Sequence, residues 1–309
     1  MSRVLVVGAG VVGLSCAVRL LEAGHRVDVV ARDLPLETTS AVAAAIWYPY
    51  RALPQDRVTA WSATCFTELS RLAEVPGTGV RLQEGSELLR LPAPDPWWRS
   101  AVPDLTRLAT PPEGYADGWS FVAPVVEMPV YLRWLQARVE ELGGTVSRLD
   151  LSALPVPGRA SGLDLVVSCV GIGARLLGAD PTVVPVRGQV VRLAQVGLER
   201  WVLDGEGPTY VVPREHDVVV GGTAEEGEWS RTPDPQVAEQ VLARATRLVP
   251  ELADARVLAH RVGLRPARPS VRLEREGDVV HCYGHGGAGV TLSWGCADEV
   301  VALAGEEKS

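Results

Sequence analysis

Two glycine-rich turns near opposite ends of this 309-residue chain carry residue types that can bind a phosphate-bearing cofactor. The first is Gly8-x-Gly10-x-x-Gly13, which follows a short apolar run at residues 3–7 and opens a helix-like run at residues 11–21. In a strand–turn–helix unit, such glycines allow a tight turn, close approach of a pyrophosphate and close helix packing. The free N–H groups at the helix start attract the phosphate charge. The motif therefore predicts dinucleotide binding.

The context of this turn supports the prediction, because a second strand-like run at residues 26–30 completes a βαβ unit. The acidic residue that usually ends the second strand would fall near Ala31, but the chain continues with Arg32 and Asp33. We therefore expect a rearranged set of contacts to the ribose of the cofactor.

The second glycine-rich turn lies within residues 283–295, where Gly286, Gly287 and Gly289 precede an apolar helical run at residues 290–303. A helix in this position can aim its N-terminal N–H groups at the electron-rich pyrimidine edge of an isoalloxazine ring. Tyr283 and His285 make an ordinary glycine-rich loop a less attractive interpretation. The segment therefore indicates a flavin.

Four sequence blocks, at residues 4–15, 38–50, 262–274 and 283–295, occur in the order found in one known family. On these blocks, which span nearly the whole chain, the sequence resembles the FAD-dependent D-amino-acid oxidase and D-aspartate oxidase family. The run Gly-Leu-Arg-Pro-x-Arg-Pro joined to Tyr-Gly-His-Gly-Gly separates it from glycine and sarcosine oxidases. The resemblance implies oxidative deamination of D-amino acids to 2-oxo acids, with ammonia and hydrogen peroxide as the other products.

The resemblance also implies which residues contact FAD. We expect the cofactor to be non-covalent, because none of His281, Cys282 and His285 matches an attachment position of the family. The expected contacts, from the pyrophosphate and ribose through adenine to the flavin, are Gly8, Gly10, Val11, Val12, Gly13, Arg32, Asp33, Thr38, Thr39, Ser40, Ala44, Ala45, Ile46, Leu149, Gly286, Gly287, Ala288, Gly289, Val290 and Thr291.

Oxidation by hydride transfer from the substrate Cα to flavin N5 requires the protein mainly to orient the substrate. Arg265 is the expected carboxylate clamp, because a planar guanidinium binds a carboxylate through two parallel hydrogen bonds. By the resemblance, Tyr210 supplies a second carboxylate contact and the Gly287 carbonyl accepts from the amine. Tyr48 and Tyr50 are expected in the pocket wall.

The segment after Gly221-Gly-Thr223 bears on the preferred side chain, because D-aspartate oxidases carry an arginine there. In this chain Ala224, Glu225 and Glu226 follow, so an acidic substrate would be repelled. We expect neutral, medium-to-large D-amino acids as the best substrates, with basic ones in reserve if a glutamate faces the pocket. The residues expected to line an apolar or aromatic pocket are Trp47, Tyr48, Tyr50 and Val212.

Other functions stay open. A nicotinamide-dependent dehydrogenase would explain the first glycine turn and leave residues 283–295 unexplained. A non-enzymatic flavoprotein would bind FAD and release no peroxide. Within the family, a D-aspartate oxidase or a glycine- or sarcosine-type oxidase remains an alternative.

The fold expected to position these residues is α/β, with a Rossmann-like FAD-binding domain interwoven with an α+β substrate domain built on a mixed sheet. The first domain should take residues 1–50, 128–184 and 261–309, and the second should take residues 51–127 and 185–260. Helical periodicity at residues 129–142 and 235–249 supports one helix in each. The Pro- and Trp-rich residues 91–99 are predicted to form a surface connection.

Composition excludes some partners. A net charge of −8 without a basic block disfavours nucleic acid, and no apolar run reaches membrane-spanning length. We see no signal peptide and no peroxisomal C-terminal address, so we expect a cytoplasmic, bacterial enzyme whose partners are a D-amino acid and oxygen; a homodimer is left open. The five cysteines show no paired spacing, so they are interpreted as small buried hydrophobes, with no metal site.

Overall fold

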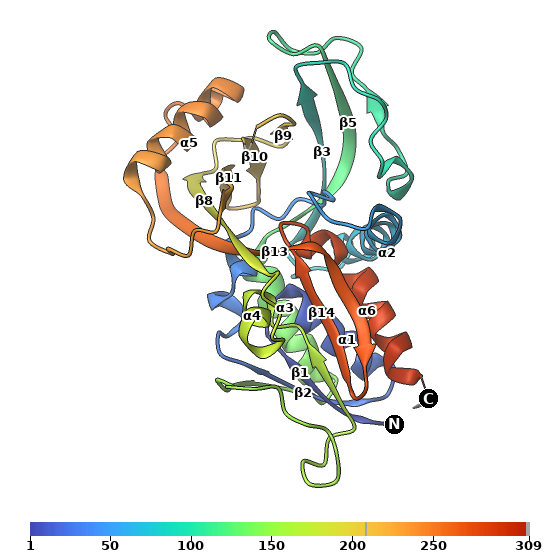
Figure 1. Cartoon of the computed structure of the whole chain (residues 1–309). Coiled ribbons are helices and arrows are strands. Elements are labelled where there is room, and N and C mark those ends of the chain that lie inside the picture. Colours follow the sequence, from blue (N-terminus) through green and yellow to red (C-terminus); the bar gives the residue numbers. More distant parts are fainter. Residues whose placement is uncertain (208, 307–309) are drawn as a thin grey trace.

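The computed structural model of this chain describes residues 1–207 and 209–306 and arranges them around one continuous mixed sheet (Figure 1). Its strands are β1 (Arg3–Val7), β2 (Arg26–Ala31), β3 (Val80–Leu89), β4 (Thr106–Arg107), β5 (Asp117–Val126), β6 (Thr145–Arg148), β7 (Leu165–Ser168), β8 (Val184–Ala194), β9 (Trp201–Asp204), β10 (Tyr210–Pro213), β11 (Asp217–Gly221), β12 (Glu225–Glu226), β13 (Val257–Glu276) and β14 (Val279–His285). Their order is β4-β5-β3-β9-β10-β11-β8-β13-β14-β7-β1-β2-β6, and β12 pairs with β8.

One end of the sheet, β14-β7-β1-β2-β6, is parallel and contains the first βαβ unit. The central strand β7 is nearly all apolar and all four of its residues are buried, as a parallel strand covered on both faces requires, whereas the edge strand β6 is mostly exposed. The expected strand at residues 3–7 and the expected helix at residues 11–21 are confirmed by β1 and by α1 (Val11–Glu22). The structure thereby confirms the α/β class.

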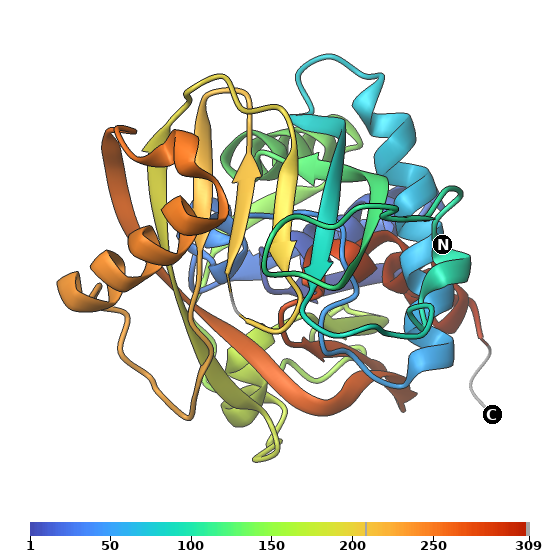
Figure 2. The ribbon, with the colours of Figure 1, turned by 90° about the horizontal axis from the view of Figure 1, so that it is seen from above.

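The long strand β13 joins the two ends of the sheet, since it pairs with β8 over its first half and with β14 over its second half. Figure 2 shows it in orange, crossing the molecule. Because the sheet is continuous, the division into interwoven domains stays a prediction, and residues 307–309 of its last segment lie outside the described residues.

Helices cover the sheet in two groups. The helices α1, α2 (Gln55–Ala73), α3 (Met128–Glu141) and α6 (Gly289–Gly305) pack around the main core, whereas α5 (Pro235–Leu248) packs on β8 and β11. A short helix, α4 (Ala174–Leu177), follows β7. Side chains alternate along β10, so Val211 faces α5 while Tyr210 and Val212 face the main core. This alternation decides which residues can reach the cavity described below.

Residues 91–99 form a mostly exposed loop, as the sequence predicts, but Trp98 within it is buried and packs against Trp47 and Tyr48 with ring centroids 5.9 and 5.5 Å apart. All five cysteines are buried, as expected, and the fold brings three of them together, as described below. In the part of the chain that the structure describes, no helix is long and apolar enough to cross a membrane.

Candidate active site

The turn between β1 and α1 has the geometry that its three glycines predict. Gly8 has φ +117°, and a Cβ there would overlap the Cys169 carbonyl. A Cβ at Gly13 would overlap the Gly8 carbonyl, so this glycine lets α1 pack directly against the turn. Gly10 is the N-cap of α1 and provides no side-chain cap, and the Val11 N–H donates to Ser40 Oγ at 3.1 Å. Backbone groups therefore dominate this end of the site.

A cavity of about 670 Å³ begins at this turn and continues to β10 and β13, a size typical of cofactor sites. The predicted residues that line it are Gly8, Gly10, Val11, Val12, Gly13, Arg32, Asp33, Thr38, Thr39, Ser40, Leu149, Gly286, Gly287, Gly289 and Val290. These residues extend from the β1–α1 turn to the turn before α6, and a cavity lined in this way can accept an elongated dinucleotide.

Five predicted cofactor residues lie outside this lining. Ala44, Ala45 and Ile46 run along β5, where the Val126 N–H donates to the Ala45 carbonyl at 2.8 Å. Ala288 is fully buried as the N-cap of α6, and Thr291 Oγ1 exchanges two 3.0 Å hydrogen bonds with the backbone of Tyr48. These five residues pack behind the residues that line the cavity. Their contact with a cofactor stays a prediction.

The cavity end beside β2 contains the rearranged polar group expected from the sequence. Arg32 Nη2 donates to Asp33 Oδ2 at 2.6 Å, and this bond lowers the pKa of Asp33 against the effect of burial. The charge of Arg231 also lowers that pKa, and Arg231 and Trp229 line the same cavity from a loop before α5. Sequence reasoning missed both residues, because nothing local marks a distant loop that folds over β2.

The other end of the cavity is built around Arg265 on β13. Its Nη1 donates to the Thr223 carbonyl at 2.9 Å, which orients the guanidinium and leaves other N–H groups for a ligand. On the neighbouring strand β8, Gly188 leaves the space that the guanidinium fills, since a Cβ there would lie 2.5 Å from Cζ. A side chain at residue 188 would therefore displace Arg265.

Tyr210 lines the same end of the cavity and also depends on glycine for space. It pairs in register with Gly221 on β11, where a Cβ would lie 2.5 Å from Tyr210 Cε2. Burial raises the pKa of the Tyr210 hydroxyl, and the nearby charge of Arg265 acts in the opposite direction. The hydroxyl therefore stays protonated at neutral pH and can donate to an anion held by Arg265.

Three of the five predicted substrate residues, Arg265, Tyr210 and Gly287, line the large cavity. Tyr48 and Tyr50 instead line an adjacent cavity of about 450 Å³, together with Trp98 and other residues. Tyr50 forms the shared wall, because a Cβ on Gly287 would lie 2.9 Å from Tyr50 Cδ1. Trp47 and Val212, also expected near the substrate, are fully buried in the core.

A buried carboxyl group behind Tyr48 was missed from the sequence. Glu87 on β3 is only 6% exposed, and its Oε1 accepts a 2.6 Å hydrogen bond from the Tyr48 hydroxyl. Burial raises the pKa of Glu87 although this hydrogen bond lowers it, and burial together with the charge of Glu87 raises the pKa of Tyr48. A single glutamate in a strand usually faces solvent, so its sequence position gave no signal of this role.

The glutamates expected to govern the substrate side chain do not face either cavity. Glu225 pairs with the buried Arg187, with Arg187 Nη1 2.9 Å from Glu225 Oε2, and Glu226 is exposed. Among the described residues that line the smaller cavity, Arg51 and Glu206 are the charged ones. The electrostatic argument from Glu225 and Glu226 is therefore wrong for this structure.

Comparison with known proteins agrees with this geometry. The family model described as "FAD dependent oxidoreductase" (DAO) matches residues 3–303. A D-amino-acid oxidase of Rubrobacter xylanophilus is 55% identical over 98% of this chain and 96% of its own length, and a human D-aspartate oxidase is 35% identical over 99% and 95%. A glycine oxidase structure from Bacillus cereus shares the fold with a TM-score of 0.82 at 19% identity, covering 100% of this chain and 96% of that chain.

Proposed function

This chain belongs to the DAO family of FAD-dependent oxidoreductases, and from that premise we propose that it oxidises neutral D-amino acids. The products are a 2-oxo acid, ammonia and hydrogen peroxide. The observation that carries the proposal is the convergence of Arg265 and Tyr210 at the cavity end that the Gly286–Gly287 turn also lines. Arg265 and Tyr210 can hold the carboxylate of an α-amino acid, and the start of α6 can hold the flavin. Their closeness would bring the substrate and the flavin together.

The cavity fits FAD, because backbone from the β1–α1 turn faces one end and the turn before α6 faces the other. Arg32 and Asp33 would hold the adenosine ribose, and Gly286 to Thr291 would cover the pyrimidine edge of the flavin. Bound FAD supplies the redox chemistry as the acceptor of hydride from the substrate Cα. We propose non-covalent binding, so acid precipitation should release the yellow colour into the supernatant; colour in the pellet would contradict this.

The chain's own residues orient the substrate. Arg265 binds the carboxylate in two parallel hydrogen bonds, because its Nη1–Thr223 bond fixes the plane of the guanidinium. The Tyr210 hydroxyl donates a further bond, and the Gly287 carbonyl accepts from the amine. These three contacts fix the Cα–H direction, which is the protein's main contribution to a hydride transfer.

The substrate side chain extends past Tyr50 toward the smaller cavity. Tyr48, Tyr50 and Trp98 give that cavity aromatic walls, while Arg51 and Glu206 bring opposite charges that favour neither an acidic nor a basic side chain. This arrangement supports a preference for neutral, medium-to-large D-amino acids.

The test is peroxide release from D-phenylalanine, D-methionine, D-lysine and D-aspartate, with L-amino acids, glycine and sarcosine as comparisons. We expect the highest kcat/KM for D-phenylalanine or D-methionine. A D-aspartate oxidase is the second candidate, since Arg51 lines the smaller cavity and a D-aspartate oxidase is among the relatives. The highest kcat/KM with D-aspartate would overturn the neutral preference and support that candidate.

The domain division, a homodimer and a cytoplasmic location in a bacterial cell remain proposals. Identity to a bacterial relative supports the bacterial source. Sedimentation measures the oligomeric state and cell fractionation measures the location. Limited proteolysis with and without FAD tests whether residues 51–127 and 185–260 separate from the rest as a unit.

A further inference from the structure

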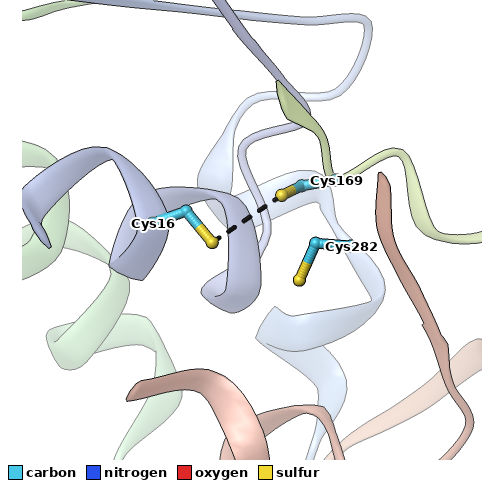
Figure 3. Close-up of side chains that lie close together, drawn as sticks. All are labelled: Cys16, Cys169 and Cys282. Atoms are coloured by element: carbon cyan, nitrogen blue, oxygen red, sulfur yellow. Dashed lines mark hydrogen bonds between the residues drawn. The ribbon is translucent and has the colours of Figure 1, made fainter. Parts of the chain in front are cut away.

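Three buried cysteines lie close together in the main core (Figure 3). They are Cys16 on α1, Cys169 immediately after β7, and Cys282 on β14, and their Sγ atoms all lie within 4.8 Å of one another. The structure describes every cysteine of the chain, and each one is a free thiol. The cluster therefore holds reduced sulfur at a place where a redox reaction is expected nearby.

Two of these thiols occupy neighbouring places on adjacent strands. β7 and β14 are parallel, and their register pairs Ser168 with His281, so Cys169 and Cys282 are the next residues in step. Neighbouring strands lie about 4.8 Å apart, which falls within the Cα separation of about 4.4–6.8 Å that a disulfide accepts. A bond between Cys169 and Cys282 therefore needs little movement of the backbone.

The cofactor cavity borders the same two residues. Cys169 and Cys282 both line the cofactor cavity, whereas Cys16 lies behind them with its Sγ 3.9 Å from Cys169 Sγ. Hydrogen bonds from Cys16, Cys169, Cys296 and His285 lower the pKa of Cys282 against the effect of burial. Cys282 is therefore the member of the cluster best suited to react as a thiolate.

We propose that hydrogen peroxide entering the cofactor cavity oxidises Cys282 and Cys169 to a disulfide, and that this bond weakens FAD binding. The oxidant is the product of the proposed function, so the physiological part of the proposal rests on that function. The Cys282 thiolate attacks peroxide, which gives a sulfenic acid and hydroxide; the Cys169 thiol then displaces that hydroxyl group as water. In sum, two thiols and one hydrogen peroxide give one disulfide and two waters.

The link to FAD binding is the contact between Cys169 and the glycine turn. The Cys169 N–H donates to the Val7 carbonyl at 2.8 Å, and its own carbonyl lies where a Cβ on Gly8 would be. A Cβ on Gly13 would lie 3.2 Å from Cys169 Cβ. Because the turn has no spare space on this side, even a small movement of Cys169 toward Cys282 shifts the backbone that should receive the pyrophosphate.

The first test adds hydrogen peroxide to apoprotein and to FAD-loaded protein, without substrate, and counts free thiols by alkylation and mass spectrometry. We expect the apoprotein to lose two thiols, at Cys169 and Cys282, and the loaded protein to lose them more slowly because FAD covers both. Cys65→Ser is the matched control, since Cys65 is buried outside the cluster. Unchanged thiols, or a disulfide that excludes Cys282, would overturn the proposal.

The variants separate the two chemical steps. Cys169→Ser should stop at the sulfenic acid, so dimedone should label Cys282, whereas Cys282→Ser should resist oxidation. FAD titration of the oxidised protein should give a Kd raised at least about fivefold, the lower end of common coupling factors, and dithiothreitol should restore it. An unchanged Kd would refute the link to the cofactor.

A turnover arm distinguishes this proposal from the function on which it rests. Protein supplied with a D-amino acid and oxygen should accumulate the same disulfide, and catalase should prevent it. If no D-amino acid yields peroxide while added peroxide still forms the bond, the proposed function fails and the thiol chemistry stands. If turnover yields peroxide and Cys282 stays reduced in both arms, the proposed thiol chemistry fails alone.

Discussion

The two ends of the large cavity are built by different means. At the cofactor end, the β1–α1 turn presents backbone, and Gly8 and Gly13 matter because a Cβ at either would overlap a neighbouring carbonyl. At the substrate end, two side chains, Arg265 and Tyr210, carry the polar groups, and glycines on the adjacent strands leave space for them. At the cofactor end, glycine thus lets backbone segments pack closely together. At the substrate end, it leaves space for the side chains of Arg265 and Tyr210.

This difference predicts how each end fails. A side chain added at Gly8 or Gly13 meets backbone, which cannot move without disturbing the sheet. A side chain added at the substrate end meets the far end of a flexible side chain, which can swing away. The first kind of change should therefore affect folding and FAD binding, and the second should affect only the handling of the substrate.

Gly8→Ala should have the largest effect. At φ +117° a Cβ is strained by roughly 1–3 kcal/mol, and the overlap with the Cys169 carbonyl adds to that cost. We expect protein that is less stable and retains no FAD after gel filtration. Gly24→Ala is the control, because Gly24 also has positive φ, +86°, but has no atom within 4 Å of its Cβ position. Full FAD content in Gly8→Ala would show that the cofactor end does not depend on this glycine, and would contradict the proposed difference between the two ends of the cavity.

Arg265→Ala should come next. Each charge-assisted hydrogen bond contributes on the order of 1.5–3 kcal/mol, so losing two should lower kcat/KM by about 10²- to 10⁴-fold. FAD content and melting temperature should stay near those of the unaltered chain. Arg261→Ala, an exposed arginine on the same strand, should be neutral. Near-normal kinetics for Arg265→Ala would show that the assigned binding mode is wrong, and Tyr210→Phe should be milder.

Gly188→Ala tests the substrate end without touching a polar group. Its Cβ would lie 2.5 Å from Arg265 Cζ, so the guanidinium must shift. A misplacement of about 1 Å can cost up to about 10²-fold, so we expect kcat/KM to fall by roughly 10- to 100-fold with FAD retained. Gly305→Ala, with open space around it, is the control. Loss of FAD in Gly188→Ala would mean that the two ends are not separable.

The same difference explains what the sequence could predict. The first glycine turn is a local motif, so β1 and α1 were correctly expected. Most of the residues predicted to bind the cofactor line the cavity, as do Arg265 and Tyr210, and their roles stay predictions. Glu87, Arg231 and Trp98 could not be expected, because each reaches its place through strand pairing or a loop crossing over long sequence distances. The Cys169–Cys282 neighbourhood likewise depends on the β7–β14 register, which no sequence spacing reveals.

The smallest expected effect concerns Glu87, the buried carboxyl group of the substrate end. Its pKa is raised in the folded protein, so the folded state holds the proton more tightly than the unfolded state. The contribution of Glu87 to the free energy of unfolding should therefore be greatest at a pH below the ordinary glutamate pKa, and should fall as pH rises through the raised value. Glu87→Gln removes this titration and keeps an oxygen that accepts from Tyr48.

The melting temperature of Glu87→Gln relative to the unaltered chain should therefore increase between pH 5 and pH 8, by about 1–3 °C. Glu84→Gln is the matched control on the same strand, because Glu84 is exposed, bonds to Arg200, and has a lowered pKa. Its relative melting temperature should not increase over that range. If the melting temperature of Glu87→Gln relative to the unaltered chain does not change with pH, ionisation of Glu87 does not destabilise the folded protein. Tyr48 and its surroundings would then already compensate the charge of Glu87.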